Sequence, residues 1–175
     1  NTLLLIHGGE AYTGALTDET TQSCVAFDGT GDYLSVPDHA DWDFGTGDWA
    51  IDFWVYMDTP QEECFIAQYD SGTNQRAWTI EAISSTTLQV WRSDTGGEGG
   101  SVANHTYAPV AKTWHHIAVA RDTNNLRAFF DGAQIGSTTD ITGYDYFDSS
   151  AAMTIGSRLS SGSAVVLFTG KMAEI

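Results

Sequence analysis

The chain has 175 residues, of which 7 are Lys or Arg and 23 are Asp or Glu, so its formal net charge at pH 7 is −16. This charge argues against nucleic acid and anionic membrane surfaces as partners, because both bind Lys and Arg. It fits a solvated acidic surface, since the acidic residues are scattered, and it also permits cation binding. The length predicts one domain, residues 1–175, and no apolar run is long enough for membrane insertion.

The first part of the chain predicts three strands. Asn1–His7 contains a continuous apolar run and is expected to be a buried strand. Ser23–Phe27 and Tyr33–Val36 are the next predicted strands, joined by a glycine-rich turn that carries Asp28 and Asp32. Both aspartates are turn formers, and this is the preferred interpretation. The alternative is a calcium site, because Ca²⁺ binds carboxylate and main-chain oxygens.

An aromatic loop and two strands follow. Asp38–Asp48 is predicted to be a loop with one helical turn. Trp49–Met57 is a strong predicted strand, with one face formed by Ile51, Phe53 and Val55 and the other by Asp52, Trp54 and Tyr56. Cys64–Tyr69 is another predicted strand. The two cysteines, Cys24 and Cys64, allow one disulfide or two free buried thiols, and the sequence leaves both possibilities open.

Ala77–Ile83 and Leu88–Arg92 are expected to form a hairpin. One face of this hairpin is apolar, and the other carries Thr79, Glu81, Gln89 and Trp91. Asp94–Ser101 is rich in glycine, which predicts a mobile surface loop. Val102–Val110 is short and irregular in pattern.

Trp114–Gly136 is the most regular stretch and predicts a three-stranded meander. Its strands are His115–Arg121, Leu126–Phe130 and one that starts in Ala133–Gly136, with turns at Asp122–Asn125 and Asp131-Gly132. A meander with one apolar face needs a second sheet to cover it.

The remainder continues the pattern of short strands between turns. Ser137–Asp148 is a predicted loop, Ala151–Ile155 a strand, and Ser157–Ser163 a polar loop. Val165–Thr169 and Lys171–Ile175 are the closing strands. No segment has helical periodicity, so the expected fold class is an all-β, two-sheet antiparallel sandwich.

Four stretches resemble laminin-G-like domains of the concanavalin A-like superfamily, and they occur in that family's order. They are Trp114–Gly136, which begins Trp-His-His-Ile-Ala-Val, then Ser23–Pro37, Trp49–Tyr56 and Phe168–Ile175. The resemblance implies a jelly roll whose first strand pairs with the last. It also implies a module of a longer secreted, cell-surface or virion protein. Relatives often hold a structural calcium near the last strand, but Ala173 replaces the expected Asp. Calcium at Asp28 and Asp32 is therefore an option, and no cofactor is required.

Catalytic signatures of the same fold are missing from the sequence. The glucanase strand motif Glu-x-Asp-x-x-Glu does not occur, nor do the Gln-x-His and Tyr-x-Lys segments of polysaccharide lyases. His115 and His116 are adjacent on a strand, so they face opposite ways and cannot bind one metal together. A structural role is preferred for His116. We therefore expect no enzymatic activity.

Aromatic and polar side chains on the non-core faces of the strands favour a carbohydrate or cell-surface ligand, because sugar rings stack on aromatic rings. If these strands form one curved sheet, its concave side would carry Trp54, Tyr56, Glu81, Gln89, Trp91, His116, Arg127 and Phe129. An alternative site at the rim would use Trp42, Asp94, Tyr144 and Tyr146. The competing hypotheses are a structural or protein–protein interaction domain, in which these side chains only stiffen the sheet, and a glycan-processing enzyme of the glucanase type.

Overall fold

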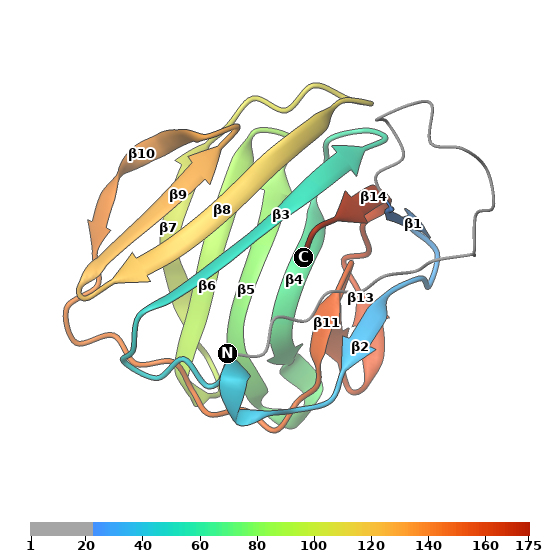
Figure 1. The fold of residues 1–175 in the computed structure, drawn as a ribbon. Helices are drawn as coiled ribbons and strands as arrows, with labels where there is room; N and C mark the ends of the chain where they lie inside the picture. The colour runs from blue at the N-terminus through green and yellow to red at the C-terminus, as the bar shows by residue number, and fades with distance from the viewer. Residues whose placement is uncertain (1–22) are drawn as a thin grey trace.

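A computed structural model describes residues 23–175 as two antiparallel sheets packed face to face (Figure 1). The six strands of sheet A follow the order β1-β14-β3-β8-β9-β10. Their bounds are Val25–Asp28 (β1), Thr169–Ala173 (β14), Trp49–Met57 (β3), Trp114–Asp122 (β8), Asn125–Phe130 (β9) and Ala133–Asp140 (β10). The predicted all-β sandwich and the predicted meander are confirmed.

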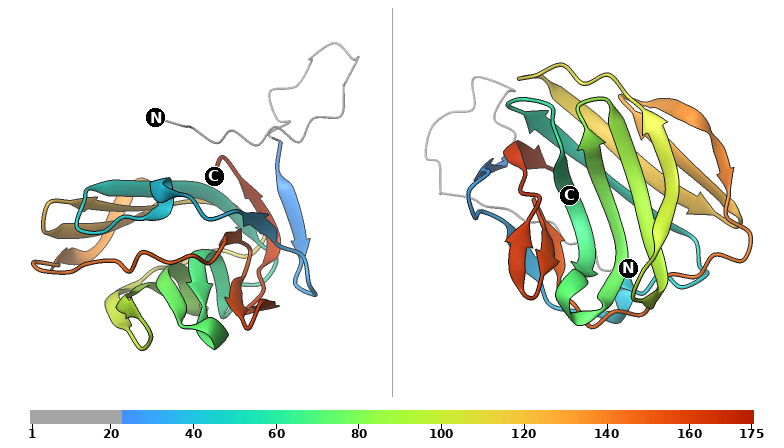
Figure 2. Two further views of the ribbon diagram at one scale, coloured as in Figure 1. Left: turned by 90° about the horizontal axis from the view of Figure 1, so that it is seen from below. Right: turned by 180° about the vertical axis from the view of Figure 1, so that it is seen from behind.

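Sheet B lies behind sheet A in Figure 1 and is the nearer sheet in the right-hand view of Figure 2, and it contains the order β13-β12-β4-β5-β6-β7. These strands are Ser163–Val165 (β13), Arg158–Ser160 (β12), Glu63–Asp70 (β4), Gln75–Ser84 (β5), Thr87–Gly96 (β6) and Gly100–Thr106 (β7). β11 (Met153–Ile155) pairs with both β4 and β2 (Leu34–Val36). Residues 23–175 contain two short 3₁₀ turns, Ala40–Trp42 and Ser71–Thr73, and no α-helix.

The core forms where the apolar faces of the two sheets meet. β3 and β8 turn Phe53 and Ile117 inward from sheet A, and β5 and β6 turn Ile80 and Leu88 inward from sheet B, all with no exposed surface. Each such side chain contributes about 1.5–3 kcal/mol through burial. Because side chains alternate along a strand, the residues between these core positions face away from the core.

Several predicted boundaries are wrong. The predicted polar loop Ser157–Ser163 contains β12 and the start of β13, and the predicted strand Val165–Thr169 is mostly the connection between β13 and β14. The predicted mobile loop Asp94–Ser101 shrinks, because β6 runs to Gly96 and β7 starts at Gly100. Cross-strand pairing within the hairpins β12–β13 and β6–β7 extends these strands beyond their apolar pattern.

The prediction for Asn1–His7 lies outside the described residues. Within them, β14 already has a strand on each side, since Met172 pairs with both Val25 of β1 and Val55 of β3. Cys24 is exposed and Cys64 is buried, and both are free thiols.

Candidate functional site

The outer face of sheet A carries a row of half-buried aromatic side chains. Tyr56 of β3 pairs with Trp114 of β8, and Trp54 pairs with His116. The ring centroids of these two pairs lie 5.6 and 5.2 Å apart, within the usual range for aromatic contacts. Together with Phe129 on β9, these residues form what we call the sheet A platform. It joins four of the predicted ligand-binding residues, and Trp114 is an addition that the predicted set lacked.

Polar side chains border the sheet A platform. Asp52 Oδ2 lies 3.1 Å from His116 Nε2, and the Lys171 Nζ atom lies 5.2 Å from the centroid of the Tyr56 ring. Ala118 pairs with Asp52 on one side and with Phe129 on the other, so a small residue separates a carboxylate from an aromatic ring. The arrangement offers ring faces for stacking beside hydrogen-bonding groups, which is how proteins hold sugar rings.

The predicted single binding face is wrong, because the structure divides its residues between the two sheets. Trp54, Tyr56, His116, Arg127 and Phe129 lie on sheet A. The remaining three, Glu81, Gln89 and Trp91, lie on the outer face of sheet B, on the other side of the sandwich. Side-chain alternation predicts which residues face away from the core, but it does not show which sheet each strand joins.

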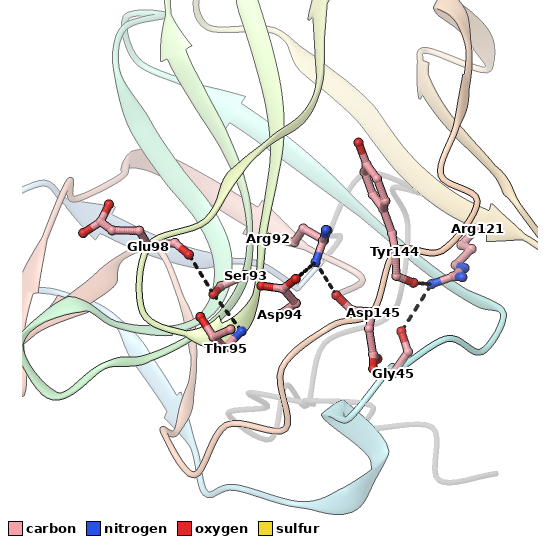
Figure 3. A network of polar contacts seen from close by, with 9 residues as sticks. All are labelled: Gly45, Arg92, Ser93, Asp94, Thr95, Glu98, Arg121, Tyr144 and Asp145. Carbon is pink, nitrogen blue, oxygen red and sulfur yellow. Dashed lines mark hydrogen bonds and ion pairs between the residues drawn. The ribbon is translucent and has the colours of Figure 1, made fainter.

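The predicted rim site, at the loops around Trp42, Asp94, Tyr144 and Tyr146, is held together by two arginines that bind backbone oxygens (Figure 3). Arg121 is 4% exposed and donates from one terminal nitrogen to the carbonyl oxygens of Gly45, at 3.2 Å, and Tyr144, at 3.1 Å. Arg92 donates to the Asp145 carbonyl oxygen at 2.6 Å, and its Cζ lies 4.3 Å from the centroid of the Tyr144 ring. The loops of this rim are therefore fixed to the ends of β6 and β8.

Of the predicted rim residues, the structure brings Asp94 and Tyr144 together around Arg92, with Asp94 Oδ2 3.8 Å from Arg92 Nη1. Tyr146 is only 3% exposed and packs its ring against Phe44 and Trp49. Trp42 is half-buried, and its carbonyl oxygen accepts a hydrogen bond from the Trp78 indole. The aromatic side chains of this rim belong mainly to the core, so fewer of them remain for a ligand than the sequence indicated.

Asp28 and Asp32 border an open cleft of ≈ 310 Å³ beside β14 that also contains Asp58 and Lys171. Hydrogen bonds from the Thr30 side chain and from the Thr30 N–H, which lies 2.7 Å from Asp28 Oδ1, lower the pKa of Asp28. Asp32 Oδ2 accepts from the Asp28 N–H. The carboxylates thus serve the turn, and within residues 23–175 no group of three acidic, His or Cys side chains is arranged to hold a metal. Ca²⁺ takes six to eight oxygens, main-chain oxygens among them, and calcium at Asp28 and Asp32 stays a prediction.

Comparison with known proteins gives the family. The profile described as concanavalin A-like lectin/glucanases superfamily, of the laminin G type, matches residues 28–175. The chain belongs to this superfamily. No curated protein sequence matches it.

Several solved structures have a fold similar to that of this chain at low sequence identity. The sialidase CBM40 of Ruminococcus gnavus, bound to α2,3-sialyllactose, has a TM-score of 0.60 at 11% identity, covering 87% of this chain and 92% of its own. Mouse laminin α1 domains LG4-5 give 0.59 at 13%, with 87% of this chain and 39% of that one covered. Domain 4 of the Geobacillus stearothermophilus extracellular arabinanase AbnA, bound to arabinotriose, gives 0.58 at 15%, with 86% and 67% covered.

The superfamily includes glucanases, which need two carboxyl groups beside the scissile bond. Glu81, on the sheet B face, is 4% exposed and its Oε2 lies 3.4 Å from Arg158 Nε. Burial raises the pKa of Glu81, while Arg158 and the Thr79 hydroxyl oppose this shift. Its cross-strand neighbour Cys64 is fully buried, which raises the pKa of the thiol. Neither group is placed to reach a substrate.

Residues 23–175 also lack any helix with the length and hydropathy that crossing a membrane requires.

Proposed function

We propose that the domain is a non-catalytic carbohydrate-binding module whose sheet A platform stacks against neutral sugar rings. The observation that carries the proposal is the pair of aromatic contacts Tyr56–Trp114 and Trp54–His116 on an outer face, with Asp52 and Lys171 at its border. Two structural neighbours are bound to sugars, namely arabinotriose and α2,3-sialyllactose, which supports a glycan as the ligand class.

The setting proposed for this module is extracellular or at a cell surface. One structural neighbour is a domain of an extracellular arabinanase, and laminin domains are another. The neighbours described above include no virion protein, so they give the virion setting no support. The proposed ligand is then a polysaccharide or glycan outside the cell or on its surface.

The test combines a glycan array with calorimetry. The array is probed with and without millimolar calcium, and the best glycan is titrated against the wild type and against Trp54→Ala and Trp114→Ala. We expect each substitution to weaken binding by about tenfold, because a stacked aromatic ring dominates such contacts. Trp91→Ala, on the other side of the sandwich, is the matched control and should bind the neutral glycan normally.

A structural or protein–protein interaction domain is the second candidate. The observation in its favour is that the aromatic pairs of the sheet A platform are direct cross-strand partners, and such pairs also stabilise sheets. This second candidate is preferred if no glycan binds and if the only effect of Trp54→Ala is a lower thermal stability.

A further inference from the structure

A second aromatic centre lies on the outer face of sheet B, opposite the sheet A platform. Tyr69 of β4 pairs with Arg76 of β5, and Arg158 lies beside it because Leu159 of β12 pairs with Asp70. The Cζ atoms of Arg76 and Arg158 lie 5.9 and 5.3 Å from the centroid of the Tyr69 ring. Two of the seven basic residues in a chain of net charge −16 therefore flank one ring.

Both guanidinium groups keep unused hydrogen-bond donors. Arg158 is ion-paired to Glu81 through Nε alone, and its terminal nitrogens donate to no described residue. Arg76 donates from Nη2 to the Ser71 carbonyl oxygen at 3.0 Å, while its buried Nε has no hydrogen-bond partner within residues 23–175. Arg76 Nε is out of reach of a ligand, but the terminal nitrogens are not excluded in this way. The planar fork of a guanidinium matches the two oxygens of a carboxylate, so these terminal nitrogens fit a carboxylate ligand.

A carboxylate of the chain itself already lies at this position. Glu98 Oε1 is 3.5 Å from Arg76 Nη1, although the Glu98 side chain is 98% exposed. The Glu98 backbone is fixed, because the buried Ser93 hydroxyl donates to its carbonyl oxygen at 3.3 Å (Figure 3). The next residue, Gly99, lies so close to Trp91 that a Cβ there would be 2.5 Å from the indole ring. The loop thus presents an exposed carboxylate to Arg76.

Trp91 supplies the apolar side of the same site. Its half-buried ring meets the Tyr69 ring edge-on, with centroids 5.3 Å apart. A sugar ring can pack against this aromatic pair while its charged substituent reaches the arginines.

We propose that this face of sheet B is a second binding site, for a sugar that bears a carboxylate. The ligand carboxylate binds at the outer edge of the Tyr69 ring, where Arg76 lies on one side and Arg158 on the other. Its ring packs on Trp91, and Glu98 is the internal carboxylate that it displaces from Arg76. This site differs from the sheet A platform in both location and charge, so it is independent of the proposed neutral-sugar function.

The test compares sugars that differ only in charge. Trigalacturonic acid and its methyl ester form one pair, and 3′-sialyllactose and lactose form another, each titrated by calorimetry at constant ionic strength. We expect the acid of at least one pair to bind about tenfold tighter than its neutral partner. The pair that shows this preference identifies the source of the carboxylate. Equal affinities within both pairs would overturn the proposal.

Three variants test the geometry. Glu98→Gln should strengthen binding of the acid about threefold without changing the neutral partner, because an internal competitor is removed. Arg76→Gln should abolish the preference for the acid. The double variant Glu81→Gln/Arg158→Gln should do the same without leaving a buried unpaired charge. A preference that survives in both arginine variants overturns the assignment. Trp54→Ala, on the other sheet, should leave the affinity for the acid unchanged even if it weakens the neutral partner, which separates this result from the test of the sheet A platform.

Discussion

His115 Nδ1 lies 2.8 Å from Asp131 Oδ2, while Nε2 of the same ring accepts a hydrogen bond from the Val110 N–H at 2.9 Å. The proton is therefore assigned to Nδ1, which donates to the carboxylate. This pair contains two members of a catalytic triad, but a backbone amide occupies the position of the nucleophile. His115 is 5% exposed and stacks on Phe130, so its role is to join the loop before β8 to the turn after β9.

Asp131→Asn should destabilise the domain by about 1–2 kcal/mol although it preserves shape. The Asn amide keeps one oxygen, which either continues to accept from the His116 N–H or turns to His115, but not both. Urea unfolding measures the effect. Asp145→Asn is the control, since the contact of Asp145 with Arg92 uses its backbone oxygen. Equal stability of the two variants would contradict the role assigned to this pair.

Glu63 makes stability depend on pH. It has no exposed surface, and burial raises its pKa from 4.5 to about 8. Between these two values the folded protein holds a proton that the unfolded chain releases. Stability should therefore fall as pH rises from 4.5 to 8, by up to about 1.4 kcal/mol per pH unit. Glu63→Gln should flatten this slope, whereas Glu62→Gln, at an exposed neighbour, should not. Chemical unfolding across this pH range provides the comparison, and parallel slopes for both variants would refute the prediction.

Arg121→Lys should cost about 2–3 kcal/mol, because Lys cannot reproduce the planar fork that donates to Gly45, Thr123 and Tyr144. Arg127→Lys is the matched change on the outer face of sheet A and should stay within about 0.5 kcal/mol. Thermal unfolding distinguishes them. If both variants melt together, the rim loops do not depend on the Arg121 hydrogen bonds.

Gly136→Ala should destabilise the edge where β10 approaches β7. A Cβ at Gly136 would lie 2.1 Å from His105 Nδ1, and its φ is +63°. Gly132 also has positive φ, but a Cβ there would meet nothing within 4 Å. We expect about 1–2 kcal/mol for Gly132→Ala from conformation alone, and about 2–4 kcal/mol for Gly136→Ala. Denaturant midpoints give the difference, and its absence would mean that His105 moves aside freely.

Local alternation predicted much of the fold, because it follows from the two faces of a strand. The predicted Trp49–Met57 strand matches β3, and Ile117 and Val119 point inward as expected. The short hairpin β12–β13 was missed, because its Ser-rich sequence lacks apolar alternation. Its position depends on Asp70, far away in the chain, which pairs with Leu159 and whose carboxylate accepts hydrogen bonds from the Ser161 and Gly162 N–H groups.

The candidate site was less predictable for the same reason. Trp54 and Trp91 both alternate outward, but pairing between distant segments places them on opposite sheets. The pair of Glu81 and Arg158 is equally non-local. His115 and His116 face opposite ways on β8, as alternation predicted. A structural role was preferred for His116, but His115 has the clearer one, because it is buried and bound to Asp131.

Binding on the sheet A platform can be followed by an NMR titration of the indole N–H signals with the neutral glycan that binds most tightly. We expect the Trp54 and Trp114 signals to shift along one saturable curve, while the Trp91 signal, on the other side of the sandwich, stays fixed. Shifts at Trp91 with none at Trp54 and Trp114 would contradict binding on the sheet A platform.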